Sequence, residues 1–128
     1  MRLNQVTAPC RDLDASIEFY RLLGLKLIVK SPHYARFELP DGGATFSLHL
    51  TQGEIPTANA PSLYFECDDV DAEVARLKAG GLGFEHEPKM QEWLWYEAWL
   101  RDPSGHALCL YRAGANRTHP PWRIEGKE

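Results

Sequence analysis

A six-residue segment occurs twice in this chain, and the repeat constrains the fold more than any other feature of the sequence. Residues 10–15 read CRDLDA and residues 67–72 read CDDVDA, so four of the six positions are identical. The same offset of 57 residues aligns Gly24 with Gly81 and Gln5 with Ser62. A constant offset indicates internal duplication. Two copies are too few for a solenoid, so we infer two fused copies of one supersecondary module.

Hydrophobic periodicity predicts the same order of elements in both copies. Each copy begins with a strand, continues with a helix that follows Asp12 or Asp69 and ends near Gly24 or Gly80, and finishes with three further strands. The predicted strands are 3–8, 25–29, 34–39 and 45–50, then 62–67, 82–87, 95–101 and 107–112. We therefore expect modules at 1–51 and 62–113 within one domain over 1–113, a linker at 52–61, and an irregular tail at 114–128.

Each predicted sheet has one apolar and one polar or aromatic face. In the strand 45–50, Phe46 and Leu48 alternate with Ser47 and His49. The apolar face can pack on the helix of its own module, which leaves the other face free. We therefore predict an α+β fold of two tandem βαβββ modules whose polar-aromatic faces enclose a cleft.

Composition excludes several classes of function. The chain has 128 residues, 44% of them hydrophobic and 25% charged, as is normal for a globular domain. No apolar run is long enough to span a membrane, and the first residues lack the apolar core of a signal peptide. The net charge is −4 with scattered cations, and the three cysteines lack CxxC spacing. We expect a reducing, cytoplasmic location and no nucleic-acid or membrane partner.

Two motifs resemble the vicinal oxygen chelate superfamily, which includes glyoxalase I, extradiol dioxygenases, fosfomycin-resistance proteins and bleomycin-binding proteins. The first motif is DLDASIEFY at 12–20, which runs on to Leu23-Gly24-Leu25, and the second is LRDPSGH at 100–106. The resemblance covers roughly residues 1–113. It implies paired βαβββ modules and a homodimer whose subunits often share the cleft, and it says little about chemistry.

In metal-using members, the resemblance implies ligands on the first and last strands of each module. The matching residues here are Gln5, Ser62, His49 and Cys109, of which only His49 is a strong ligand. Strand alternation adds Glu97 on the open face of the second module. A divalent ion such as Fe, Mn, Ni or Zn could then be held by Gln5, His49 and Glu97.

Each of these residues also has an ordinary structural explanation. Glu97 could act as a catalytic base if its pKa were raised, or could simply be solvated or salt-bridged. His49 could be a hydrogen-bonded residue of the cleft, and Cys109 could be a small packing residue. We expect the remaining histidines, at positions 33, 86, 106 and 119, on the surface.

A row of aromatic residues supplies a second candidate site. Trp95 and Trp99 share a strand face and Trp93 extends the row, so together they could form a flat platform for a planar ligand. Core or dimer packing is the alternative explanation. The candidate ligand-binding residues are Tyr64, Trp95, Trp99, Arg36 and Cys109.

Two functions remain open from the sequence. One is a metal-dependent enzyme of the glyoxalase or dioxygenase type, acting on a small oxygen-rich or aromatic molecule. The other is a metal-free protein of the bleomycin-resistance type, which sequesters a planar ligand, cationic or not, between aromatic and acidic residues. The net charge of −4 fits a cationic ligand without requiring one.

Overall fold

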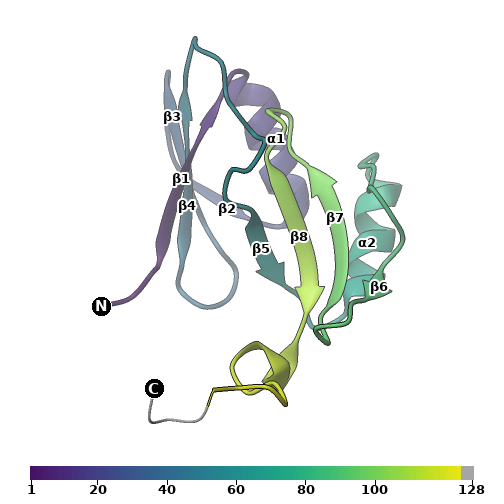
Figure 1. The fold of residues 1–128 in the computed structure, drawn as a ribbon. Coiled ribbons are helices and arrows are strands. Elements are labelled where there is room, and N and C mark those ends of the chain that lie inside the picture. Colours follow the sequence, from purple (N-terminus) through teal and green to yellow (C-terminus); the bar gives the residue numbers. More distant parts are fainter. Residues whose placement is uncertain (125–128) are drawn as a thin grey trace. The chain divides into compact units, whose positions relative to one another are not determined.

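The computed structural model describes residues 1–124 and contains two four-stranded mixed sheets, each with one α-helix (Figure 1). The chain divides into two compact units. Unit 1 comprises residues 1–61 and 101–106, and unit 2 comprises residues 62–100 and the chain from 107 onward. The predicted α+β class and the two βαβββ modules are confirmed. Within the described residues, neither α-helix is long and apolar enough to cross a membrane.

Unit 1 contains the first module. Its elements are β1 (Gln5–Cys10), α1 (Leu13–Leu23), β2 (Lys26–Ser31), β3 (Tyr34–Glu38) and β4 (Thr45–Leu50). The strand order is β1-β4-β3-β2, with β1 parallel to β4 and the other pairs antiparallel. The predicted strand 45–50 is confirmed to the residue, and the other predicted boundaries in this module differ by at most two residues.

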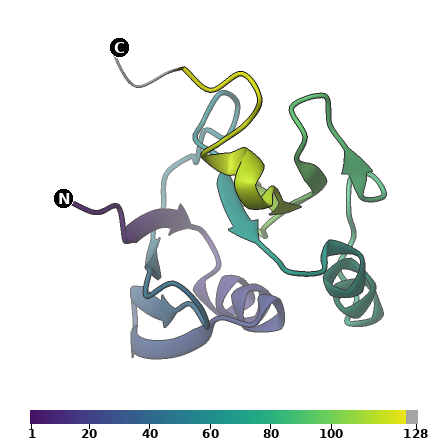
Figure 2. The same ribbon diagram turned by 90° about the horizontal axis from the view of Figure 1, so that it is seen from below.

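Unit 2 contains the second module. Its elements are β5 (Leu63–Glu66), α2 (Val70–Ala79), β6 (Lys89–Met90), β7 (Tyr96–Arg101, whose last residue belongs to unit 1) and β8 (Ala107–Arg112). The strand order is β5-β8-β7-β6, with β5 parallel to β8. A 3-10 helix, η1 (Gly114–Arg117), follows β8 in the tail that was predicted to be irregular; it is the yellow-green helical turn in Figure 2.

The predicted strand at 82–87 is wrong. This segment has no regular strand, and only the two-residue β6 follows it. Gly81 adopts a left-handed conformation with φ of 100°, and Pro88 has no N–H to donate to a ladder. One backbone hydrogen bond, from Glu85 N to Trp99 O at 2.8 Å, ties the segment to β7. The alternating apolar pattern at 82–87 therefore belongs to a loop beside β7 and not to a strand.

The repeated hexapeptide forms the helix N-termini. Asp12 Oδ1 accepts a hydrogen bond from Ala15 N, and Asp69 Oδ1 accepts one from Ala72 N, each at 3.0 Å. Both aspartates have extended backbone dihedrals, as N-cap residues do. Gly24 ends α1 in the left-handed conformation with φ of 106°, which a residue with a Cβ rarely adopts. The repeat thus encodes two identical helix starts.

The apolar face of each sheet packs on the helix of its own module. In unit 1, the buried ring of Tyr20 lies 4.5 Å from that of Phe46 and 5.9 Å from that of Phe37, centroid to centroid. In unit 2, Val70, Val74 and Leu77 of α2 are buried, as are Leu108 and Leu110 of β8. The predicted helical stripes and strand alternation are confirmed at these positions.

A buried carboxylate organises the turn at 102–106. Asp102 Oδ1 accepts hydrogen bonds from Ser104 N and His106 N, both at 2.9 Å, while its Oδ2 accepts one from Tyr20 Oη at 2.7 Å. His106 was predicted to lie on the surface, but it is buried, and its Nε2 lies 2.7 Å from Pro9 O. His106 is therefore a packing residue of unit 1, because its ring nitrogen finds a backbone partner.

The Tyr20–Asp102 bond should contribute measurably to stability. We expect Tyr20→Phe to lower the free energy of unfolding by about 1.5–3 kcal/mol, because a buried carboxylate loses a charge-assisted donor. Tyr96→Phe is the matched control, since Tyr96 Oη donates to the exposed Asp71 at 2.6 Å. Urea denaturation measures both variants. If Tyr20→Phe and Tyr96→Phe lowered the free energy of unfolding equally, the buried Tyr20–Asp102 bond would not contribute more than the exposed one, and the prediction would be wrong.

Candidate functional site

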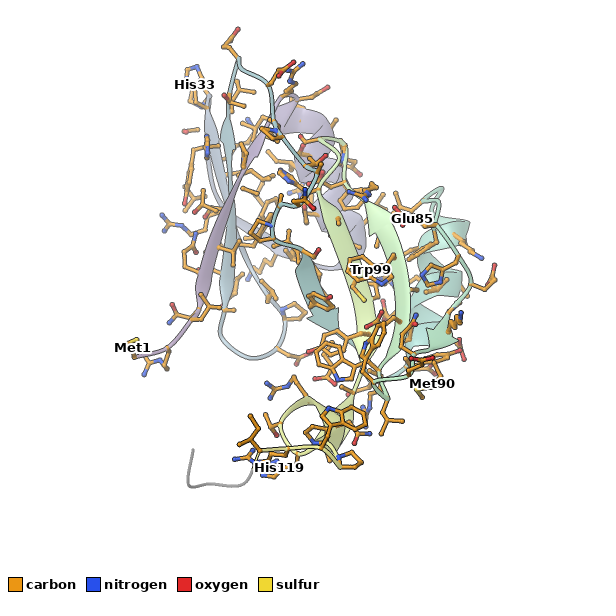
Figure 3. All side chains as sticks on the ribbon, viewed as in Figure 1. Met1, His33, Glu85, Met90, Trp99 and His119 are labelled. Atoms are coloured by element: carbon orange, nitrogen blue, oxygen red, sulfur yellow. The ribbon has the colours of Figure 1, made fainter. Side chains whose placement is uncertain are left out.

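The face of the unit 2 sheet that lies opposite α2 carries a cluster of four aromatic rings. The ring of Tyr64 on β5 meets those of Trp95, Trp99 and Tyr111 edge to face, at centroid distances of 5.7, 5.4 and 5.6 Å. Trp95 stacks on Tyr111 at 4.6 Å. Tyr64 is 47% exposed, so the cluster is open to solvent at its centre. Figure 3 labels Trp99 on this sheet.

Glu97 lies buried among these rings. Its side chain is 1% exposed, and each carboxylate oxygen accepts a hydrogen bond from an indole: Oε2 from Trp93 Nε1 at 2.9 Å, and Oε1 from Trp99 Nε1 at 3.0 Å. Within residues 1–124 no cation forms an ion pair with Glu97, although Lys89 opposes it in the β6–β7 register. The proposed solvated or salt-bridged state of Glu97 is therefore wrong, because neutral indole N–H groups hold a buried acid.

The buried acid and its surroundings raise the pKa values of nearby groups. Burial first, then the charge of Glu97, raises the pKa of the Cys109 thiol to about 12. Burial also raises the pKa of Tyr64, with Cys109 and Glu97 adding to the effect. Cys109 is fully buried and packs with Tyr111 and Ala113 against Trp95 and Trp99. At neutral pH it is a protonated thiol, which is a poor metal ligand.

The chain after β8 is fastened along the edge of the aromatic cluster. Glu66 Oε2 accepts hydrogen bonds from Ala113 N at 2.9 Å and Gly114 N at 3.0 Å, and Trp95 Nε1 donates to Asn116 O at 3.3 Å. Burial alone would raise the pKa of Glu66, but these N–H donors and the nearby arginines outweigh it and lower the pKa. Glu66 therefore anchors the tail and is unsuited to act as a base. Trp122, farther along the tail, is 56% exposed.

The corresponding face of unit 1 carries a chain of hydrogen-bonded polar groups. Gln5 Nε2 donates to Ser47 Oγ at 2.9 Å, Ser47 Oγ lies 2.7 Å from Tyr34 Oη, and Arg36 Nε donates to Tyr34 Oη at 2.9 Å. His49 opposes Tyr34 across β3 and β4 and is exposed. The sequence identified Gln5, Arg36 and His49 individually. It missed Tyr34, although alternation along β3 puts Tyr34 on the same face as Arg36.

The predicted metal ligands Gln5, His49 and Glu97 are divided between the two units. Gln5 and His49 belong to unit 1 and Glu97 to unit 2. Both oxygens of Glu97 already accept indole N–H groups, and the amide oxygen of Gln5 accepts the Thr45 hydroxyl. Nowhere in the described chain do three His, Cys, Asp or Glu residues gather as metal ligands would. The metal site at Gln5, His49 and Glu97 stays a prediction.

The fold defines a protein built from two βαβββ modules, each with one sheet face that its own helix leaves uncovered. Residues 2–110 match the family model of the Glyoxalase/Bleomycin resistance protein/Dioxygenase superfamily. The chain belongs to this superfamily, which confirms the family resemblance drawn from the motifs at 12–25 and 100–106. No curated protein sequence matches the chain.

Solved structures of the same fold include proteins with different activities. A bleomycin-binding protein complexed with bleomycin is 24% identical, with a TM-score of 0.72 and coverage of 88% of this chain and 98% of its own. Lactoylglutathione lyase from Agrobacterium tumefaciens is 24% identical, with a TM-score of 0.70 and coverage of 87% and 92%. A glyoxalase/bleomycin resistance protein/dioxygenase from Nocardioides is 21% identical, with a TM-score of 0.79 and coverage of 98% and 90%.

The hydrogen bonds of Tyr34 should make it the most acidic tyrosine of the chain. The Ser47 hydroxyl first, and then Arg36, lower its pKa from the usual 10.0, whereas burial raises the pKa values of Tyr20, Tyr64 and Tyr111, and a hydrogen bond to Asp71 raises that of Tyr96. On raising the pH, we expect a phenolate absorbance step of one tyrosine below pH 10. This step should vanish in Tyr34→Phe and persist in Tyr96→Phe. A first step that survives Tyr34→Phe would refute the assignment.

Proposed function

We propose that this protein binds and sequesters a planar aromatic cation on the open face of the unit 2 sheet. The proposal selects the metal-free alternative of the two functions left open by the sequence. Its ligand-binding residues are Tyr64, Trp95 and Trp99, and Glu97 lies beneath them. The observation that carries it is the burial of Glu97 with no cationic partner among residues 1–124.

A buried carboxylate is costly when no positive charge compensates it. Glu97 is 1% exposed, and its two hydrogen bonds come from neutral indoles, which orient the carboxylate without cancelling its charge. A ligand that brings a positive charge over the indole rings would supply the missing compensation. The field of Glu97 and the negative faces of the rings act in the same direction on such a ligand.

The aromatic cluster offers a surface suited to a flat ring. Tyr64 and Trp93 are each 47% exposed, an unusual state for large apolar side chains that otherwise pack in cores. Their contacts with Trp95, Trp99 and the Glu97 carboxylate hold the rings in one orientation before any ligand arrives. Such preorganisation lowers the entropy cost of binding. A structural relative is a bleomycin-binding protein complexed with bleomycin, so this fold can serve as a binding protein.

Fluorescence titration with proflavine, a planar aromatic cation, tests the proposal. We expect saturable quenching of tryptophan fluorescence, and about tenfold weaker binding in Trp99→Leu, because a stacked ring and its cation–π contact are lost. Trp122→Leu is the matched control, since this tryptophan lies in the tail and is 56% exposed. Absence of saturable binding to the wild type would refute the proposal.

Glu97→Gln separates charge from shape. The substitution keeps the size of the side chain and removes its charge, so we expect about tenfold weaker binding of proflavine. Binding of a neutral tricyclic analogue should change little. In Glu97→Gln, the N–H of one indole would face the new amide NH₂, and two donors in contact lower stability. The thermal unfolding midpoint of each variant is therefore measured beside the titration. Equal affinity of folded Glu97→Gln and wild type for proflavine would contradict the role of the charge.

The rival function is a divalent-metal-dependent enzyme of the glyoxalase or dioxygenase type. Its support is the exposed His49 on the same face as Gln5, at positions where metal-using members of the superfamily carry ligands. Elemental analysis of untagged protein, with His49→Ala beside it, tests this rival. Our proposal predicts substoichiometric Fe, Mn, Ni and Zn in both proteins. A stoichiometric ion that is lost in His49→Ala would favour the enzyme. The homodimer and the cytoplasmic location also stay predictions.

A further inference from the structure

A directed chain of hydrogen bonds crosses the open face of the unit 1 sheet. The Thr45 hydroxyl donates to Gln5 Oε1, which turns the amide nitrogen of Gln5 toward Ser47. Gln5 Nε2 then donates to Ser47 Oγ at 2.9 Å. The series of hydrogen bonds therefore starts at Thr45 on β4 and Gln5 on β1, and each group donates to the next as far as Ser47.

The burial of Ser47 determines the next step. Its side chain is 0% exposed, so its hydroxyl hydrogen cannot be given to solvent and needs an acceptor in the protein. Within residues 1–124, the acceptor within reach is Tyr34 Oη at 2.7 Å. We therefore assign Ser47 as the donor to Tyr34, because its buried hydroxyl hydrogen has no other acceptor within hydrogen-bond distance among residues 1–124.

The hydroxyl hydrogen of Tyr34 is thereby directed away from the protein. Tyr34 Oη accepts from Ser47 and also from Arg36 Nε at 2.9 Å, which uses its two acceptor positions. Its own O–H then points toward the partly exposed side of the ring. Two donors that converge on one phenol oxygen also make its remaining hydrogen a stronger donor.

Arg36 contributes a positive charge beside this donor. Its guanidinium carbon lies 5.4 Å from the centroid of the Tyr34 ring. Among residues 1–124, only Nε of Arg36 has a hydrogen-bond partner, and no carboxylate lies within ion-pair distance of the guanidinium. The two terminal nitrogens are therefore free to form a forked contact with an oxyanion.

The other polar groups of this face limit the charge of that oxyanion. His49 opposes Tyr34 in the register and is exposed, so it offers one further donor. Glu38 lies two residues beyond Arg36 on the same face, opposite Lys26 of β2. On this face the charges of Glu38 and Lys26 cancel, so the guanidinium of Arg36 supplies the remaining positive charge. The face therefore suits a ligand with one negative charge better than a ligand with two. A carboxylate fits this balance, and a phosphate dianion does not.

We propose that the Tyr34 hydroxyl and the Arg36 guanidinium form a carboxylate-binding site on the β3–β4 face of unit 1. The carboxylate takes the forked N–H groups of Arg36 on one side and the hydroxyl of Tyr34 on the other. The site is built from different residues and in a different unit from the aromatic surface of unit 2. It stands or falls independently of the planar-cation proposal.

A nuclear magnetic resonance titration with benzoate tests the site, with neutral benzamide as the matched probe at constant ionic strength. We expect saturable shifts of backbone amides of β3 and β4 with benzoate and none with benzamide. Tyr34→Phe and Arg36→Lys should each weaken benzoate binding by about tenfold. Arg21→Lys, an exposed arginine in the last turn of α1, should bind benzoate as the wild type does.

Three outcomes would overturn the proposal. The first is the absence of saturable benzoate shifts in the wild type. The second is benzoate binding in Tyr34→Phe that equals that of the wild type, since this variant keeps the ring and loses only the hydroxyl. The third is inorganic phosphate binding on these strands more tightly than benzoate, which would assign the face to a different anion. Amide spectra of the free variants confirm that each is folded.

Discussion

The parallel pairing of the first and last strands of each module is the constraint on which the rest of the structure depends. Parallel neighbours cannot be joined by a hairpin, so a crossover must leave the sheet and return to it. In each module the crossover includes the helix, which covers the apolar face of the sheet. The opposite face has no covering element of its own module. Side chains on that face are not needed for packing against the helix, so their chemistry can vary between the units.

The two open faces have diverged from their common ancestor. Unit 2 carries large rings around a buried acid that has no cationic partner in the described part of the chain. Unit 1 carries hydroxyls, an amide and a guanidinium joined by hydrogen bonds. Gln5 of unit 1 corresponds to Ser62 of unit 2, and His49, the fifth residue of β4, corresponds to Tyr111, the fifth residue of β8. The scaffold places residues reliably, and substitutions on the open faces change the chemistry without disturbing the helix-facing core. The same fold is found in a lactoylglutathione lyase and in a bleomycin-binding protein.

Local sequence predicted the elements wherever local physics decides them. The N-caps Asp12 and Asp69, the left-handed Gly24 and the strand 45–50 are all where the pattern predicted them. The prediction failed at 82–87, which forms no regular strand and has one backbone hydrogen bond to β7, and at His106, whose ring is buried against Pro9 O. Both failures depend on partners far along the chain, which no local pattern records.

The candidate sites divide in the same way. Alternation along the strands was sufficient to assign Glu97, Trp99, Arg36 and Gln5 to open faces, because the side chains of a strand point alternately to its two sides. Only the tertiary structure shows that indoles from positions 93 and 99 hold both oxygens of Glu97, and that the buried Ser47 lies within hydrogen-bond distance of Tyr34. The sequence by itself determined the duplication, the helix starts and the face of each residue, since these follow from neighbouring residues. Only the tertiary structure decided which side chains are buried and which hydrogen-bond partners they have. Both depend on residues that are distant in the sequence and become neighbours when the chain folds.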